Sequence, residues 1–273
     1  MTVETTVLLD IPGLDLPLRL QIHGSADQVV SAGLRDNQIW EPFETSLFVD
    51  LLKPGDVVVD VGANLGYFSI IAGALIGGAG RVFAFEPDPD NYALVLANIA
   101  LNDFGDRVAA EPAGLSDQDQ DGRLYLSEDN LGDHRIFPGA DARNSCEIKL
   151  LNGSEFLGTR VSRVDFLKVD TQGSEYAVLA GLMSLLTALP RIPQILVELT
   201  PFSLRQAGSS GRQLIELLNQ LNQPFWIVDH VEHRLVASTA EDLARWCDNV
   251  DGCTGDEGFM NILVGSGLES THN

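Results

Sequence analysis

The fold is decided by one segment, VVVDVGANLGYF at residues 57–68. Four valines surround the acid Asp60, and a turn that begins at Gly62 and ends at Gly66 leads into an apolar stretch. This pattern predicts a buried strand, a tight turn and a helix whose N-terminus faces a ligand. The two glycines let the backbone pass close to that ligand, because they carry no Cβ atom.

The turn differs from the dinucleotide-binding fingerprint G-x-G-x-x-G, which would place glycine at positions 64 and 67. The chain has Asn64 and Tyr67 there, so the sequence counts against a pyrophosphate ligand. The remaining pattern, Asp-x-Gly-x-x-x-Gly, resembles motif I of S-adenosylmethionine-dependent methyltransferases, with asparagine at the middle glycine position. This resemblance implies cofactor contacts at four positions: Asp60, Gly62, Asn64 and Gly66.

A second carboxylate stands at a suitable distance from this turn. Residues 81–86, RVFAFE, predict the next strand, and Glu86 lies at its carboxyl end, 26 residues after Asp60. In a doubly wound sheet, ligands bind outside the carboxyl ends of the strands. A carboxylate there accepts hydrogen bonds from ribose hydroxyls, which both NAD and S-adenosylmethionine carry. The alternative is an ordinary strand–helix–strand unit with a charged loop, which the spacing of the two features disfavours.

The composition restricts the classes of partner. The 273 residues carry a formal net charge of −22, and the 17 Lys and Arg residues are scattered. Such a field repels nucleic acid and anionic membranes, although solubility is the simpler explanation of the acidity. Charges among the first thirty residues argue against a signal peptide, and no apolar run would span a membrane. With three cysteines and no C-x-x-C pair, the sequence predicts a cytoplasmic protein without a zinc site.

The chain is expected to consist of an N-terminal extension and one main domain. Residues 1–52 form the extension, with a β-hairpin at 7–22 followed by helical pieces, and residues 53–273 form the domain. Strands and helices alternate in the domain, which predicts an α/β fold. Seven strands are expected, at residues 57–61, 81–86, 108–115, 165–170, 194–199, 224–229 and 259–264. A polar insertion at about 116–163 interrupts the alternation, and its length indicates a function.

Two helix starts are marked by capping residues. Asp88 is a candidate N-cap with Pro89 at the first helical position, and Ser238 forms a capping box with Glu241.

A second motif, DFLKVDTQGSE at residues 165–175, predicts a strand that ends in Asp170, then a turn and a helix start. Together with the turn at 60–66, it resembles the signature of the FkbM family of methyltransferases, DFLK-hydrophobic-D-x-x-G-x-E. The match runs from about residue 40 to residue 200, with a weaker match at 261–263. It departs at Thr171–Gln172, where many members carry an apolar residue and glutamate.

The FkbM resemblance implies the fold and the activity. The fold is a Rossmann-like class I methyltransferase, a seven-stranded doubly wound sheet of order 3-2-1-4-5-7-6 whose last strand is antiparallel. The segment Trp40–Glu41–Pro42 resembles the entry to motif I, so that Glu41 joins Glu86 as an expected contact of S-adenosylmethionine. The implied activity is methylation of a hydroxyl oxygen on a small metabolite, such as a sugar or a polyketide.

An aliphatic hydroxyl attacks a methyl group only as it loses its proton, so a general base or a metal ion must lie within reach of it. Asp170 is the first candidate base because it follows the fourth strand beside motif I; its other role would be to cap the next helix. Glu198 is an acid in an apolar strand, with a pair to Arg205 as the simpler role. His134 lies in the insertion and titrates near neutral pH, or it is a plain surface histidine.

Two other functions stay open from the residues alone: an NAD-dependent oxidoreductase on a Rossmann-like scaffold, and a non-catalytic adenosine-binding module.

The segment His230–Val231–Glu232–His233 is expected to be a solvated hairpin tip, because spacing in a turn carries little ligand geometry. The sequence thus predicts no metal site, and a divalent ion beside the hydroxyl is an option that no motif supports. The motifs specify no oligomeric state.

Overall fold

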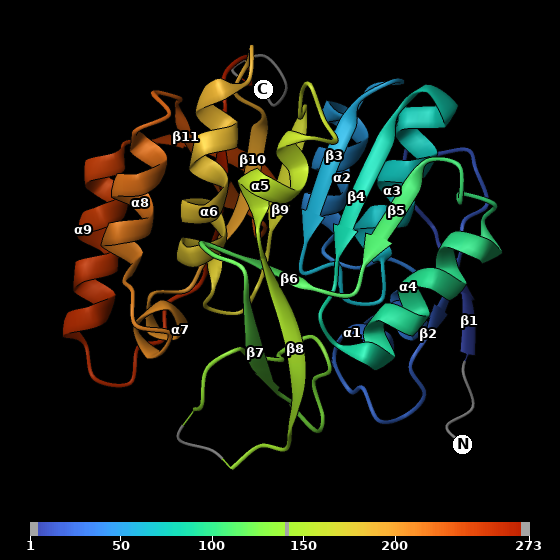
Figure 1. The fold of residues 1–273 in the computed structure, drawn as a ribbon, viewed down its shortest axis with the longest axis horizontal. Helices are drawn as coiled ribbons and strands as arrows, with labels where there is room; N and C mark the ends of the chain where they lie inside the picture. The colour runs from blue at the N-terminus through green and yellow to red at the C-terminus, as the bar shows by residue number, and fades with distance from the viewer. Residues whose placement is uncertain (1–4, 140–141, 269–273) are drawn as a thin grey trace.

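The computed structural model describes residues 5–139 and 142–268. Its centre is an eight-stranded mixed sheet (Figure 1). From one edge to the other, the strands are β5 (Val108–Glu111), β4 (Arg81–Phe85), β3 (Val57–Val61), β9 (Phe166–Val169), β10 (Gln194–Leu199), β13 (Met260–Val264), β11 (Phe225–Asp229) and β12 (Arg234–Ser238). β13 is antiparallel to both of its neighbours, whereas β5, β4, β3, β9 and β10 run parallel.

The predicted number of seven strands is wrong by one. β12 is an additional strand that pairs antiparallel with β11 at the edge of the sheet. Its residues are exposed or only partly buried, so the apolar alternation that reveals a strand in a sequence is missing there. The other seven strands lie in the order 3-2-1-4-5-7-6 when they are numbered along the chain.

Alternating side chains divide the core into two layers, one on each face of the sheet. Val58 packs with α2 (Pro42–Leu51), α3 (Tyr67–Ile76) and α4 (Pro89–Leu101) on one face. Val59 packs with α6 (Glu175–Ala188), α8 (Gly211–Asn219) and α9 (Ala240–Gly252) on the other. Strands that are covered on both faces read as continuous apolar runs, which is why residues 57–61 were recognisable as a strand. The shorter helices are α1 (Val30–Asn37), η1 (Gly77–Ala79), α5 (Gly153–Gly158) and α7 (Pro201–Gln206).

The N-terminal segment is a hairpin, as predicted, in which β1 (Thr5–Leu8) pairs antiparallel with β2 (Arg19–Ile22). Asn98 of α4 binds both the N–H and the carbonyl of Gln21 through its side chain. The hairpin is therefore fixed to the helix that follows β4. The division of the chain at residue 52 stays a prediction.

The insertion forms a second sheet of three strands, in the order β6 (Gly114–Ser116), β8 (Ser145–Asn152) and β7 (Gln120–Tyr125). The expected strand at 108–115 is thus wrong, because it is divided between two sheets. Pro112 lies at the break, where its missing N–H would interrupt a ladder of hydrogen bonds. In Figure 1 the small sheet lies beyond the carboxyl ends of β3, β4 and β5.

One of the two predicted helix caps is correct. Asp88 caps α4 by accepting hydrogen bonds from the N–H groups of Asp90 and Asn91. The predicted capping box at Ser238 is wrong by one residue, because Ser238 still belongs to β12 and the side chain of Thr239 caps α9 instead.

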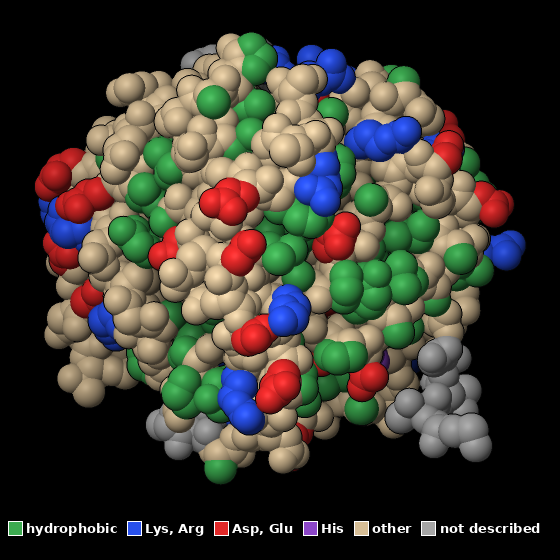
Figure 2. Space-filling model, in the orientation of Figure 1, with side chains coloured by type: hydrophobic (Ala, Val, Ile, Leu, Met, Phe, Trp, Pro, Cys, Tyr) green, Lys and Arg blue, Asp and Glu red, His purple; other side chains and the backbone are tan. Residues whose placement is uncertain are grey.

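Two further observations concern the expected partners. Within residues 5–139 and 142–268, no helix has the length and apolar character needed to cross a membrane. On the face in Figure 2, Lys and Arg side chains are dispersed among acidic and apolar ones.

Candidate active site

The first motif folds as the sequence predicts, with β3, a tight turn and α3 in succession. Three of the turn residues have a positive φ: Gly62 (82°), Asn64 (53°) and Gly66 (90°). Asparagine tolerates the left-handed conformation better than most residues, which explains its presence at the middle glycine position. A Cβ atom on Gly62 would lie 1.8 Å from the carbonyl oxygen of Asp170, and one on Gly66 would meet Val95 at 3.5 Å. The expectation that these glycines make room for a ligand is therefore wrong for the direction of the missing Cβ atoms, because both directions face protein, and the turn is packed directly against the turn that follows β9.

Glu86 connects the ends of β3 and β4. Its Oε2 accepts a hydrogen bond from the N–H of Asn64 at 2.7 Å, and its Oε1 accepts one from the N–H of Asp88 at 2.9 Å. Burial raises the pKa of Glu86 to about 8, although the two backbone hydrogen bonds act in the opposite direction. Each oxygen keeps a second acceptor position for a ligand.

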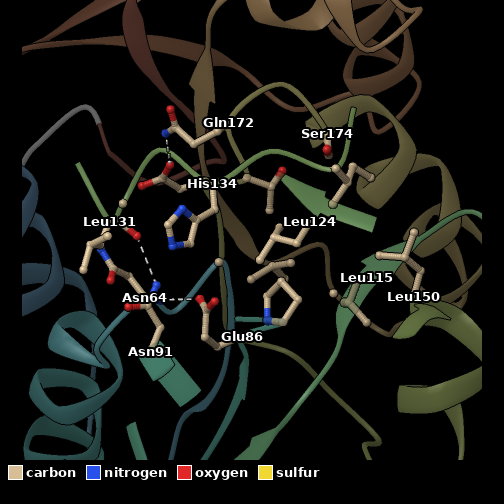
Figure 3. Close-up of a pocket in the computed structure, with 18 residues that line it drawn as sticks. Asn64, Glu86, Asn91, Leu115, Leu124, Leu131, His134, Leu150, Gln172 and Ser174 are labelled. Atoms are coloured by element: carbon tan, nitrogen blue, oxygen red, sulfur yellow. Dashed lines mark hydrogen bonds between the residues drawn. The ribbon is translucent and has the colours of Figure 1, made fainter. Parts of the chain in front are cut away.

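A pocket opens over these residues and encloses about 570 Å³ of space free of protein atoms, part of it open solvent. Figure 3 shows that its two ends differ in character. Asn64, Glu86 and His134 lie at the polar end, whereas the other end is lined mostly by apolar side chains: Leu115, Leu124 and Leu150. Leu124 and Leu150 belong to the inserted sheet, so the insertion builds one wall of the pocket.

The loop between β7 and β8 covers the polar end. Asn91 of α4 donates a hydrogen bond from Nδ2 to the carbonyl of Leu131, and its Oδ1 lies 2.6 Å from Nε2 of His23. The N–H of Gln28 also donates to the carbonyl of Asp129. The N-terminal segment, α4 and the insertion therefore meet at this end of the pocket.

His134 is a lining residue of the pocket, which agrees with its selection from the sequence. Its Nδ1 accepts a hydrogen bond from the N–H of Ser127 at 3.0 Å, and its Nε2 lies 4.0 Å from Oδ2 of Asp88. Burial lowers the pKa of His134, so its neutral form is favoured. In that form the proton is on Nε2, because Nδ1 is the acceptor.

Asp60 and Gly66 lie outside the lining of this pocket in the part of the chain that the structure describes. Asp60 is 1% exposed and accepts a hydrogen bond from Ser69 Oγ at 2.6 Å. Burial raises the pKa of Asp60. Gly66 precedes α3 as its N-cap residue.

Asp170 has both carboxylate oxygens bound by neighbouring side chains. Lys168 donates from Nζ to Oδ2 at 2.9 Å, and Gln172 donates from Nε2 to Oδ1 at 3.0 Å. The same Nε2 atom donates to Oε2 of Glu198 at 3.1 Å. Burial, followed by the charge of Asp170, raises the pKa of Glu198 well above its ordinary value. The structure thus brings two of the three candidate bases together, and His134 stands apart from this pair in its contacts.

A second, much narrower space shares Asp170 with the first and holds about 190 Å³ free of protein atoms, part of it open solvent. Glu41, expected at the cofactor, lines this cavity, with Glu44, Lys168, Glu198 and Asn261. Burial, and then the charge of Asp170, raises the pKa of Glu41 to about 8. Glu44 accepts a hydrogen bond from Asn261 at 2.9 Å.

Lys168 is a residue of the site that the sequence analysis did not select. It is 5% exposed, and its Nζ lies 4.9 Å from the ring centre of Phe68. Burial acts to lower the pKa of Lys168, but the nearby carboxylates of Asp170 and Asp60 raise it above its ordinary value. The signal was available, because a lysine inside the apolar run Phe166–Val169 needs a charged partner.

Two other features bear on metals and on capping. Among the described residues, no group of three or more His, Cys, Asp or Glu side chains has an arrangement that could hold a metal ion. Glu175 accepts hydrogen bonds from the N–H groups of Thr171 and Gly173, which stabilise the turn before α6. The N-cap residue of α6 is Ser174, which makes no side-chain cap hydrogen bond, and the oxygens of Asp170 contact Lys168 and Gln172 instead of the helix start.

The sheet order, the glycine turn after β3 and the acid after β4 define a Rossmann-like methyltransferase. The methyltransferase FkbM domain matches residues 60–225, more than half of the sequence, and the chain belongs to this family.

Two curated relatives are similar in sequence. The 31-O-demethyl-FK506 methyltransferase FkbM of Streptomyces tacrolimicus is 30% identical over 54% of this chain and 66% of its own length. Methyltransferase sdnD of Sordaria araneosa is 29% identical over 48% of this chain and 61% of its own length. The matched region spans less than two thirds of either relative. Among solved structures, a transferase from Pyrococcus horikoshii, PH0793, aligns over 97% of this chain and 71% of its own, with 13% identity and a TM-score of 0.47.

Proposed function

We propose that the chain is an S-adenosylmethionine-dependent O-methyltransferase that acts on a hydroxyl group of a small metabolite or sugar. One observation carries this proposal: Asp170 lines both the pocket that contains Glu86 and the adjoining acidic cavity. In this proposal the acceptor hydroxyl lies beside the cofactor in the first pocket, where the carboxylate of Asp170 can reach it.

The residues of the first pocket fit S-adenosylmethionine. Glu86 keeps acceptor positions for ribose hydroxyls, Gly62 contributes to the lining, and the apolar end offers a wall for a flat base. When bound, the cofactor supplies a methyl group that its sulfonium has already activated. The protein must then orient the acceptor oxygen and receive its proton.

Asp170 is our proposed general base. Lys168 and Gln172 fix its two oxygens, and each oxygen has a further lone-pair direction for the hydroxyl proton of the acceptor. Glu198 is the second choice, since burial and the charge of Asp170 raise its pKa, which makes its carboxylate a stronger proton acceptor. His134 is third, because the nitrogen that faces away from Ser127 carries a proton in the neutral ring.

The proposal also includes the cellular compartment and the class of acceptor. The cysteines Cys146, Cys247 and Cys253 are all free, which supports a reducing compartment such as the cytoplasm. The net charge of −22 supports a small-molecule acceptor over nucleic acid.

Calorimetric titration with S-adenosylhomocysteine and, separately, with NADH tests the cofactor. We expect only the first to bind; binding of NADH alone would favour the oxidoreductase alternative. Incubation with methyl-labelled S-adenosylmethionine and a library of hydroxyl compounds, followed by mass spectrometry, tests the reaction. A protein that binds the cofactor and labels nothing in a wide library would be a binding module instead.

A further inference from the structure

Gln172 has an unusual position in the acidic part of the site. It lies in the turn after β9 with a φ of 52°, and its single side-chain –NH₂ group donates to two carboxylates, Asp170 and Glu198. The two hydrogens of one amide nitrogen thus serve one oxygen each. The amide nitrogen lies between these oxygens, 3.0 Å from one and 3.1 Å from the other.

Two carboxylates this close repel each other unless a hydrogen-bond donor or a cation lies between them. The usual solutions are a shared proton, a metal ion or strong N–H donors. Lys168 is bound to the other oxygen, Oδ2, of Asp170, so its ammonium does not take the place between the two acids. The charge of Asp170 affects the pKa of five ionisable side chains around it: Lys168 on β9, Asp60 on β3, Glu41 before α2, Glu175 on α6 and Glu198 on β10. Four of these five are acids, so the amide of Gln172, which bridges Asp170 and Glu198, is one of the few donors that offset their repulsion.

We propose that Gln172 is a positioning residue whose side-chain amide occupies, between Asp170 and Glu198, the place that a cation would otherwise take. Together with Lys168, it holds Asp170 in a fixed orientation at the junction of the two cavities. The two hydrogen bonds of Gln172 are observed contacts, whereas the importance of Gln172 for turnover rests on the proposed role of Asp170 as the base.

The substitution Gln172→Glu is the sharpest probe, because it keeps the shape of the side chain and replaces the donor by a third carboxylate. Carboxylate oxygens are ligands that Mn²⁺ accepts readily. Titration of the purified protein with Mn²⁺ alone, followed by electron paramagnetic resonance, measures the effect without any acceptor. We expect the variant to bind Mn²⁺ at least about tenfold more tightly than the wild type, a change of about 1.4 kcal/mol.

Two controls define what the result means. Gln118→Glu adds the same charge at an exposed position in the loop before β7 and should leave Mn²⁺ binding unchanged. The exchange Gln172→Glu/Glu198→Gln keeps the charge of the wild type and restores one amide between the acids, so tight Mn²⁺ binding should disappear. Equal Mn²⁺ affinities of wild type and Gln172→Glu would overturn the proposal, as would tight binding by the wild type that Glu198→Gln abolishes.

A kinetic measurement separates positioning from a general structural role. With an acceptor from the library above, Gln172→Glu should lower kcat by about tenfold or more at neutral pH, on the scale of a misplaced catalytic group. The acidic limb of its pH–rate profile should move to higher pH, because the added negative charge favours protonated carboxyls. Because Gln172 also lines the first pocket, kcat is measured at saturating cofactor, so that a change in cofactor affinity does not enter the comparison. A uniform loss at every pH would contradict a positioning role, whereas an inactive wild type would contradict only the proposed function.

Discussion

The backbone N–H of Asn64 donates a 2.7 Å hydrogen bond to Oε2 of Glu86. This bond joins the turn after β3 to the end of β4, two features that the sequence presents 22 residues apart. The carboxylate is therefore already oriented in the free protein, with an acceptor position on each oxygen left for a ligand. Affinity for an adenosine-containing cofactor should depend on this orientation.

Glu86→Ala should weaken the binding of S-adenosylhomocysteine by about 1–3 kcal/mol, the usual cost of leaving a buried hydrogen-bonding group without its partner. Isothermal titration calorimetry measures it directly. Glu241→Ala, an exposed acid on α9, is the matched control and should bind like the wild type. Unchanged affinity in Glu86→Ala would mean that the cofactor lies elsewhere.

The affinity for 5′-methylthioadenosine should rise with pH. Since burial raises the pKa of Glu86 to about 8, the group is largely neutral at pH 7 and becomes charged by pH 9. A charged acceptor binds hydroxyls more strongly, by about 1 kcal/mol or about fivefold in Kd. This ligand has the ribose and adenine but no amino-acid group that titrates in the range. The pH dependence should vanish in Glu86→Ala, and a pH-dependent variant would assign the effect to another residue.

The two glycines of the turn should respond differently to alanine. In Gly62→Ala the new Cβ atom would lie 1.8 Å from the carbonyl oxygen of Asp170, so we expect a loss of about 3 kcal/mol or more in unfolding free energy. In Gly66→Ala it would meet Val95 at an ordinary 3.5 Å, and the left-handed backbone alone should cost about 1–2 kcal/mol. Urea denaturation measures both. Equal losses would show that backbone strain, and not the contact with Asp170, sets the cost.

Asp170→Asn should lower turnover by about 10²–10⁴ while leaving the affinity for S-adenosylhomocysteine nearly intact, because a general base acts only on the acceptor. Single-turnover methyl transfer measures the first effect and calorimetry the second. Asp121→Asn, exposed on β7, controls for the loss of a carboxylate. Turnover within a few-fold of the wild type would assign the base to Glu198 or His134.

Activity after EDTA treatment tests whether methyl transfer depends on a metal ion. If Asp170 acts directly as the base, EDTA should have no effect on the wild type. Loss of activity that Mg²⁺ or Mn²⁺ restores would show instead that a metal ion lowers the pKa of the acceptor hydroxyl.

Local features of the sequence were sufficient for the central part of the fold. Residues 57–68 predicted β3, its turn and α3, and Asp88 with Pro89 predicted the start of α4. Each of these elements carries its own signal, either an apolar run covered on both faces or a capping residue beside a proline. The acid Glu86 could be placed at the pocket because parallel strands bring their carboxyl ends to one edge of the sheet.

Other features could not be predicted from local sequence patterns. β12 depends on pairing with β11 more than on its own apolar residues. The position of Glu41 in the acidic cavity, and not in the pocket that contains Glu86, depends on how the segment before α2 packs against the ends of β9 and β10. Such placements involve residues far apart in the chain, and no spacing in the sequence encodes them.

The sequence by itself determined the α/β fold, the position of the glycine turn after β3 and the choice of Asp170 and Glu198 as acids near strand ends. Only the tertiary structure decided that Lys168 and Gln172 hold Asp170, and that Gln172 also reaches Glu198. The physical reason is that strand and turn signals arise between neighbours in the chain. A hydrogen bond between residues 172 and 198 instead requires two parallel strands to be brought side by side before the donor and acceptor can meet.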